Sequence, residues 1–150
     1  MTEAAQRRAV PHGGAGRGSI LLVEDDRVDA MAVQRAFREL KIGDRLEVVL
    51  DGVAALEHLE ARGEELPDLI LLDLNMPRMN GVEFLFARRE RERLRDIPVV
   101  VMTTSTDERD RLSSFDLGVS GYIVKPVDYR EFVEQIRELQ AYRTTGRWHD

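Results

Sequence analysis

The segment LILLDLNMPRMNG, from Leu69 to Gly81, carries the strongest indication of the fold. Its first four residues are all apolar, which is typical of a parallel strand that is covered on both faces. A single acid, Asp73, follows this run, and Pro77 and Gly81 are typical of a loop. The segment therefore predicts a buried strand that ends in one carboxylate and is followed by a loop.

Similar apolar runs lie on both sides of this segment and alternate with stretches of helical period. The helical stretches carry apolar residues three or four positions apart, as Val82, Leu85 and Phe86 do, which favours a core-facing stripe. The alternating charges of Arg88–Arg95 predict a solvated helix face. Strands are expected at Ile20–Val23, Leu46–Leu50, Leu69–Leu72, Val99–Met102 and Tyr122–Val124, and helices at Asp29–Leu40, Val53–Gly63, Val82–Arg95, Asp107–Leu117 and Asp128–Tyr142.

Five strand–helix units within about 125 residues are too few to close an eight-stranded barrel. They predict an α/β fold, a (βα)5 arrangement with an open, doubly wound, five-stranded parallel sheet in the common order 2-1-3-4-5. We expect this domain to span residues 19–143, between a flexible glycine-rich tail at 1–18 and a short tail at 144–150. The glycines of the first tail precede the first strand, whereas a dinucleotide-binding fingerprint follows a strand.

The composition excludes several classes of protein. The chain has 28 acidic and 22 basic residues, and its formal charge of −6 disfavours non-specific binding to nucleic acid. It has no cysteine, which excludes a disulfide scaffold, a cysteine-ligated zinc site and a cysteine nucleophile. No apolar run approaches the roughly 20 residues of a membrane span, and no apolar signal segment follows Arg7 and Arg8. These features predict a cytoplasmic domain that does not enter a membrane.

Parallel strands place their carboxyl ends at one edge of the sheet, where doubly wound folds bind their ligands. Polar residues follow four of the predicted strands at this edge: Glu24, Asp25, Asp26, Asp73, Thr103, Thr104, Ser105 and Lys125. Each has an ordinary structural explanation, since Asp26 also suits a helix N-cap and a lone lysine is usually solvated. Taken together they are harder to explain in this way, because carboxylates held close together repel one another unless a cation lies among them.

Oxygen ligands from a few carboxylates suit Mg²⁺, which also binds phosphate. A carboxylate in such a site can attack phosphorus and become an aspartyl phosphate. Asp73 is best placed for this role because it stands alone at the end of the most buried strand. Thr103 and Lys125 could bind the remaining phosphoryl oxygens. The edge of the sheet therefore predicts phosphoryl transfer to Asp73.

These residues resemble the receiver domains of two-component response regulators, over about residues 19–142. The resemblance depends on the acids after the first strand, on Asp73–Pro77 with Gly81, on Thr103 and on Lys125-Pro126. It implies a flavodoxin-like receiver fold in which Asp73 accepts a phosphoryl group from a histidine kinase. The chain would then be no enzyme in the usual sense, but a phosphoacceptor that catalyses its own phosphotransfer and autodephosphorylation.

The resemblance also implies a role for each residue of the site. The implied Mg²⁺ ligands are the side chains of Glu24, Asp25 and Asp73 and the backbone carbonyl of Asn75. The implied switch and phosphate-binding residues are the hydroxyls of Thr103 and Thr104, the rotating aromatic ring of Tyr122 and the ammonium of Lys125.

A narrower resemblance is to the small single-domain regulators that pair with bacterial phytochromes. It depends on Asp73–Pro77, on Thr103–Ser105 and on Lys125–Asp128 leading to Phe132. It implies that the partner is a phytochrome-type sensor histidine kinase. A DNA-binding effector domain would need some 70–100 further residues, so we expect no DNA binding and an output through protein contacts.

The final predicted helix carries more apolar residues than one core face requires. The surplus suggests a homodimer surface formed by the fourth helix, the fifth strand and the fifth helix, with Tyr129, Phe132 and Tyr142 as candidates.

Two other functions fit part of the pattern. A phosphohydrolase of the haloacid-dehalogenase type also forms an aspartyl phosphate, but it carries a second Asp two residues after the nucleophile, where this chain has Asn75. A phosphate-independent docking module would not need the acids and the lysine that are all present here.

Overall fold

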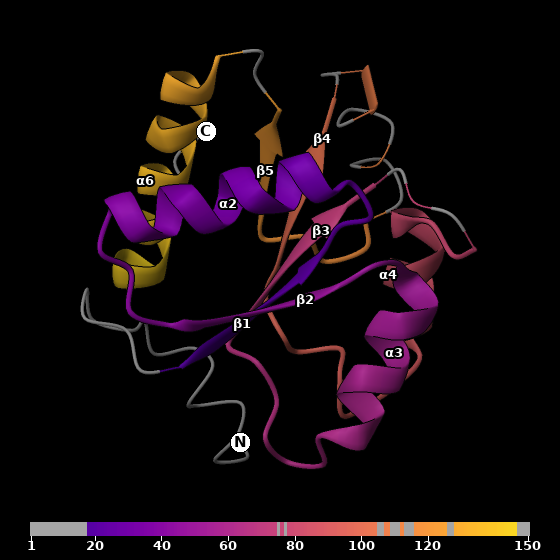
Figure 1. Ribbon diagram of the computed structural model, residues 1–150. Coiled ribbons are helices and arrows are strands. Elements are labelled where there is room, and N and C mark those ends of the chain that lie inside the picture. Colours follow the sequence, from indigo (N-terminus) through magenta and orange to yellow (C-terminus); the bar gives the residue numbers. More distant parts are fainter. Residues whose placement is uncertain are drawn as a thin grey trace.

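Five parallel strands form one sheet in the order β2-β1-β3-β4-β5, as predicted (Figure 1). The computed structural model describes residues 18–74, 76, 78–104, 107–108, 112, 116–125 and 128–146. Asn75, most of the predicted helix 107–117 and the N-terminal tail up to residue 17 lie outside these residues. The strands are β1 Ser19–Val23, β2 Arg45–Val49, β3 Leu69–Asp73, β4 Val99–Thr103 and β5 Gly121–Val124, and the helices are α2 Arg27–Glu39, α3 Gly52–Ala61, α4 Gly81–Arg89 and α6 Tyr129–Thr145.

Helices cover both faces of the sheet, with α2 and α6 on one face and α3 and α4 on the other (Figure 1). Successive strand residues point to opposite faces, so Ile70 and Leu72 pack towards α3 and α4 while Leu69 and Leu71 pack towards α2 and α6. Every residue of β3 is buried, which confirms the prediction from its continuous apolar run.

Helix α2 begins two residues earlier than predicted because Asp26 caps it. The Asp26 carboxylate accepts hydrogen bonds from the backbone N–H groups of Val28 and Asp29, at 2.8 and 3.0 Å. The N-cap explanation for Asp26 is therefore confirmed. Strand β2 ends at Val49, and Leu50 lies beyond it with 63% of its surface exposed, so the predicted boundary was one residue too long.

The predicted solvated helix face at 88–95 is confirmed only in part, because most of these charged side chains are exposed but the helix does not extend through them. Helix α4 ends at Arg89, and the chain continues as turns in which Leu94 is fully buried. Arg88 is only 3% exposed, and its guanidinium donates hydrogen bonds to the carbonyl oxygens of Arg95 and Ile97 at 2.8 and 2.7 Å. Phe86 is 37% exposed rather than part of the core stripe, because Phe84 and Leu85 occupy the buried face of the helix.

Helix α6 continues to Thr145, beyond its predicted end at Tyr142. Arg143 on the additional turn is buried and forms two hydrogen bonds with the Asp44 carboxylate, at 2.9 and 2.6 Å. Gly146 then ends the helix in the left-handed conformation, with φ of 77°. None of the helices in the described part of the chain has the length and the apolar character needed to cross a bilayer.

Candidate functional site

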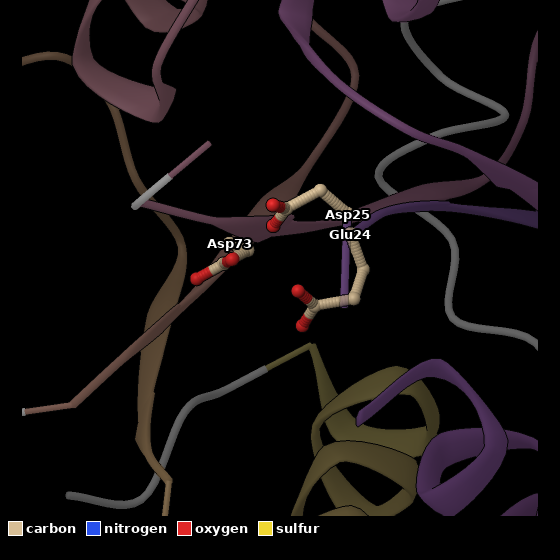
Figure 2. Close-up of side chains that lie close together, drawn as sticks. All are labelled: Glu24, Asp25 and Asp73. Carbon is tan, nitrogen blue, oxygen red and sulfur yellow. The ribbon is translucent and has the colours of Figure 1, made fainter. Parts of the chain in front are cut away.

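Three carboxylates meet at the carboxyl edge of the sheet (Figure 2). Glu24 and Asp25 directly follow β1, and Asp73 is the last residue of the neighbouring strand β3. One carboxylate oxygen of each residue lies within 4.8 Å of those of the other two. Figure 2 shows the three side chains turned towards a common space from two adjacent strands. The structure therefore brings these sequence-predicted acids together.

Burial makes this cluster electrostatically unfavourable without a cation. Glu24 is 1% and Asp73 is 3% exposed, whereas Asp25 is open to solvent. Burial, followed by the hydrogen bond and the negative charge of Asp73, raises the pKa of Glu24 to about 8, although Lys125 acts in the opposite direction. Without a cation among the three carboxylates, the charged form of Glu24 is therefore disfavoured.

Lys125 brings a positive charge to this site from the end of β5. Its Nζ lies 2.9 Å from Glu24 Oε1, 2.9 Å from Asp29 Oδ2 and 3.4 Å from Asp73 Oδ1. Burial lowers the pKa of the ammonium, but the hydrogen bonds to Glu24 and Asp29 outweigh this effect, so the pKa lies above its ordinary value. Lys125 is thus held in its charged form beside the carboxylate of Asp73.

Sequence analysis missed Asp29 as a residue of the site. Asp29 lies in the first turn of α2, where acids are common because they interact favourably with the helix dipole. Its position therefore gave no specific signal, and only the packing of α2 against the sheet brings it to Lys125.

The predicted switch hydroxyls share one carboxylate. Thr103 is fully buried at the end of β4, and its Oγ1 donates a hydrogen bond to Glu108 Oε2 at 3.1 Å. Thr104 is exposed, and its Oγ1 donates to Glu108 Oε1 at 3.0 Å. Sequence analysis missed Glu108, although its spacing of four and five residues from the two threonines allows this contact.

The loop after Asp73 is fixed by close backbone contacts. A Cβ atom on Gly81 would lie 2.7 Å from the Cα of Leu74 and 2.8 Å from the carbonyl oxygen of Asp73. The Gly81 N–H also donates a hydrogen bond to the Leu74 carbonyl at 2.9 Å. Only glycine allows the chain at residue 81 to lie this close to Leu74 and Asp73 without moving the backbone of the loop after Asp73, called the acceptor loop below.

A second contact anchors the same loop to the start of α3. The Arg78 guanidinium donates two hydrogen bonds to the Asp51 carboxylate, at 2.7 and 3.0 Å, and holds the pKa of Asp51 below its usual range. The Gly52 N–H donates to the Met79 carbonyl at 3.1 Å. These contacts join residues far apart in the sequence, which is why no local pattern predicted them.

The remaining predicted residues are aromatic, and two of them, Tyr129 and Phe132, line a hollow together with Glu24 and Lys125. Tyr122 is half-buried in β5 and packs against the core on the side of α3 and α4. Tyr129 and Tyr142 of α6 are half-buried, and the Arg35 guanidinium lies 4.3 Å from the centre of the Tyr129 ring. Phe132 is 8% exposed and belongs to the core under α2 and α6, so its assignment to a dimer surface is corrected.

Comparison with known proteins places these features in one family. Residues 20–137 match the response regulator receiver domain. The chain is 41% identical over 126 residues to the probable methanogenesis regulatory protein FilR2 of Methanothrix harundinacea, covering 82% of this chain and 81% of that protein. It is 36% identical over 127 residues to response regulator Rcp1 of a Synechocystis strain, covering 82% and 86%.

Solved structures give the same result. The crystal structure of the phosphorylated cyanobacterial phytochrome response regulator RcpA has a TM-score of 0.76 and 34% identity, covering 87% of this chain and 96% of that one. The Mn²⁺-bound form of Rcp1 has a TM-score of 0.72 and 35% identity, covering 87% and 94%. In sequence and in fold, the chain closely resembles the response regulator Rcp1 and the phytochrome response regulator RcpA, and it belongs to the response regulator receiver domain family.

Proposed function

We propose that this chain is a phosphorylation switch whose Asp73 accepts a phosphoryl group from the phosphohistidine of a sensor histidine kinase. The main support is the Asp73 carboxylate itself, which lies at the carboxyl end of β3 between two acids and the Lys125 ammonium, 3.4 Å away. An oxygen of Asp73 would attack phosphorus, so that an O–P bond forms while the N–P bond of phosphohistidine breaks. The imidazole would keep the bonding electron pair.

The donor chemistry of the acidic cluster fits a divalent cation. Three carboxylates offer oxygen atoms within 4.8 Å of one another, and burial raises the pKa of Glu24 when no cation is present. The Mn²⁺-bound form of the relative Rcp1 supports the same inference. We infer that Glu24, Asp25, Asp73 and the carbonyl of Asn75 hold Mg²⁺, which when bound would neutralise negative charge on the phosphoryl oxygens.

The other residues of the edge would bind the acyl phosphate and report its presence. Lys125 would pair with one phosphoryl oxygen, and the Thr103 hydroxyl would donate a hydrogen bond to another. A shift of Thr103 towards the phosphate would vacate space for the Tyr122 ring. The surface formed by the helix after β4, by β5 and by α6 would then repack. The chain would catalyse both the transfer and the later hydrolysis of its own acyl phosphate.

The kinase would approach the site over exposed apolar side chains near Asp25. Val28 and Met31 on α2 are 74% and 58% exposed, and Leu50 after β2 is 63% exposed. Met31 and Leu50 line the same surface hollow as Asp25. Exposed apolar groups beside the acidic cluster suit a protein partner. The resemblance to the phytochrome response regulator RcpA supports a phytochrome-type histidine kinase in this role.

The output would pass through protein contacts rather than DNA. The net charge of −6 supports the absence of DNA binding. We infer a homodimer through the helix after β4, β5 and α6, in which Tyr129 and Tyr142 remain the candidate contacts because both keep part of their surface exposed. The receiver family of the chain does not favour the alternative of a phosphohydrolase.

Labelling by a small phosphodonor tests the acceptor directly. The protein is incubated with acetyl phosphate and Mg²⁺, and the acyl phosphate is followed by intact-protein mass spectrometry. We expect Asp73→Asn to abolish labelling. Asp26→Asn is the matched control, because Asn caps α2 as well as Asp does, and it should be labelled normally. Unchanged labelling of Asp73→Asn would mean that the acceptor is another residue.

Phosphotransfer profiling tests the partner. The chain is mixed with autophosphorylated histidine kinases, including bacterial phytochrome kinases under red and far-red light. We expect the fastest transfer from a phytochrome kinase, with transfer lost in Asp73→Asn. Faster transfer from a kinase of another class would contradict the phytochrome linkage but not the acceptor role of Asp73.

A further inference from the structure

The carboxylate of Glu108 binds both hydroxyl groups that follow β4. Thr103 Oγ1 donates to Glu108 Oε2 at 3.1 Å, and Thr104 Oγ1 donates to Glu108 Oε1 at 3.0 Å. Each carboxylate oxygen therefore accepts from one of two neighbouring threonines. Glu108 itself is half-buried, and its bond to Thr103 lies away from bulk solvent because Thr103 is fully buried.

Thr103 is the residue that connects this contact to the phosphoacceptor. Asp73 pairs with Met102 in the register of β3 and β4, so Thr103 is the next residue towards the carboxyl edge. The backbone N–H of Lys125 donates to the Thr103 carbonyl at 2.7 Å, which fixes the main chain of Thr103 beside the site. With its main chain fixed, Thr103 can change partners only by rotating its hydroxyl.

A hydroxyl group carries a single proton and donates to one acceptor at a time. The proton that Thr103 donates to Glu108 is thus the proton that a phosphoryl oxygen on Asp73 would require. A carboxylate is a stronger acceptor than a neutral group, so the bond to Glu108 resists this exchange more than a bond to a neutral acceptor would.

We propose that Glu108 is a positioning residue that holds the Thr103 hydroxyl in the unphosphorylated orientation, so that phosphorylation must displace it. In this exchange the Thr103 hydroxyl changes its acceptor, while the proton stays on Thr103 and no covalent bond forms or breaks. The inference rests on the proposed role of Asp73 as the phosphoacceptor. It adds that Glu108 regulates how the phosphoryl group on Asp73 engages Thr103. Displacement of Glu108 also releases Thr104, which links the phosphate to the segment after β4.

The test compares Glu108→Gln with wild type in binding of beryllofluoride, a tetrahedral phosphoryl mimic, at saturating Mg²⁺. Gln keeps the volume of the side chain but offers one acceptor oxygen and no charge. We expect beryllofluoride to bind about fivefold more tightly to Glu108→Gln, which is the usual difference between hydrogen bonds to charged and to neutral acceptors. Asp107→Asn removes the same charge at the adjacent exposed position and should change the affinity by less than about twofold.

A second pair of variants separates the hydrogen bond from the charge of Glu108. Thr103→Val removes the hydroxyl and keeps the shape of the side chain. In that background, Glu108→Gln should no longer tighten beryllofluoride binding, whereas an effect of charge alone would persist and overturn the proposal. Equal affinities of wild type and Glu108→Gln would also overturn it. If the wild-type protein binds no beryllofluoride, the acceptor role of Asp73 fails instead, so the two failures are distinguishable.

Discussion

The Glu24 side chain is fully buried and lies beside the carboxylate of Asp73, and the Lys125 ammonium lies 2.9 Å from its Oε1 atom. Such a group stores unfavourable electrostatic energy that a bound cation can relieve. This explains how a small domain can hold a divalent ion with only three carboxylates. The same burial makes the stability of the metal-free protein depend on pH.

Glu24→Gln should remove that dependence. The folded pKa of Glu24, about 8, lies above the ordinary value of 4.5, so the stability linked to this group is complete below pH 4.5 and is lost as pH rises through 8. Urea unfolding of the metal-free wild type should therefore show a slope of up to about 1.4 kcal/mol per pH unit across this window. The slope should disappear in Glu24→Gln and persist in a variant of the exposed Glu92, Glu92→Gln.

Asp25 would contribute to metal binding without contributing to the core. It is exposed at the edge of the cluster, so Asp25→Asn should leave the denaturation midpoint unchanged. The affinity for Mg²⁺, measured by titration calorimetry, should fall by about tenfold or more, as is common when a group that holds a metal is lost. Asp26→Asn should retain the wild-type affinity. A wild-type affinity in Asp25→Asn would exclude Asp25 as a ligand.

The described residues of the loop that follows β3 make close contacts with the rest of the domain. Gly81 approaches the backbone of Leu74, and the Asp51–Arg78 ion pair holds the loop against the start of α3. A loop anchored in this way presents Asp73 and its neighbours in one geometry, which favours a reaction that depends on positioning.

Gly81→Ala should disturb this geometry. The new Cβ would lie 2.7 Å from the Leu74 Cα, so the backbone must move, and we expect a loss of about 1–3 kcal/mol in unfolding free energy. Labelling by acetyl phosphate should also slow at least several-fold. Gly63→Ala is the control, because its φ of +62° makes alanine cost about 1–2 kcal/mol at a position remote from the site. Equal labelling rates in the two variants would contradict a role for Gly81 in the acceptor loop.

The last turn of α6 depends on a buried ion pair with the loop after α2. The side chains of Asp44 and Arg143 are 0% and 4% exposed. Asp44→Asn leaves the Arg143 charge buried without its partner, and we expect a loss of about 3–5 kcal/mol in urea unfolding. Glu39→Gln at the exposed Arg35–Glu39 pair should cost less than about 1 kcal/mol. A similar small loss in Asp44→Asn would show that the buried pair contributes little.

Over the whole molecule, the candidate site residues lie at one edge of the sheet, whereas the helices form most of the outer surface. The acids, the hydroxyls and Lys125 come from the ends of four strands, and helices cover both faces (Figure 1). This separation allows a charge added at Asp73 to alter a surface elsewhere without disturbing the core.

The proposed homodimer can be tested on the whole protein in solution. We expect light scattering to give the mass of a dimer at tens of micromolar protein, with the dimer strengthened when beryllofluoride and Mg²⁺ are added. Tyr142→Ala should weaken the dimer by about tenfold. Exposed Met31 on α2 gives the control variant Met31→Ala, which should dimerise normally. A monomer under both conditions would contradict the homodimer.

The sequence by itself was enough to predict a doubly wound parallel sheet that is covered on both faces. It also identified the acids at the edge of that sheet. It could do so because continuous apolar runs, helical spacing and the residue after each strand are local features. The residues from Leu69 to Asp73 specify a fully buried strand and its terminal carboxylate without reference to the rest of the chain.

Only the tertiary structure decided which side chains share each contact. Glu108 beside the threonines and Asp29 beside Lys125 depend on how helices and loops pack at the end of the sheet. The burial of Arg88 and Phe132 likewise depends on neighbours distant in the chain, which is why charge and apolar spacing misassigned them. The physical reason is that burial and hydrogen-bond partners are properties of packing, whereas residue type and periodicity are properties of the local chain.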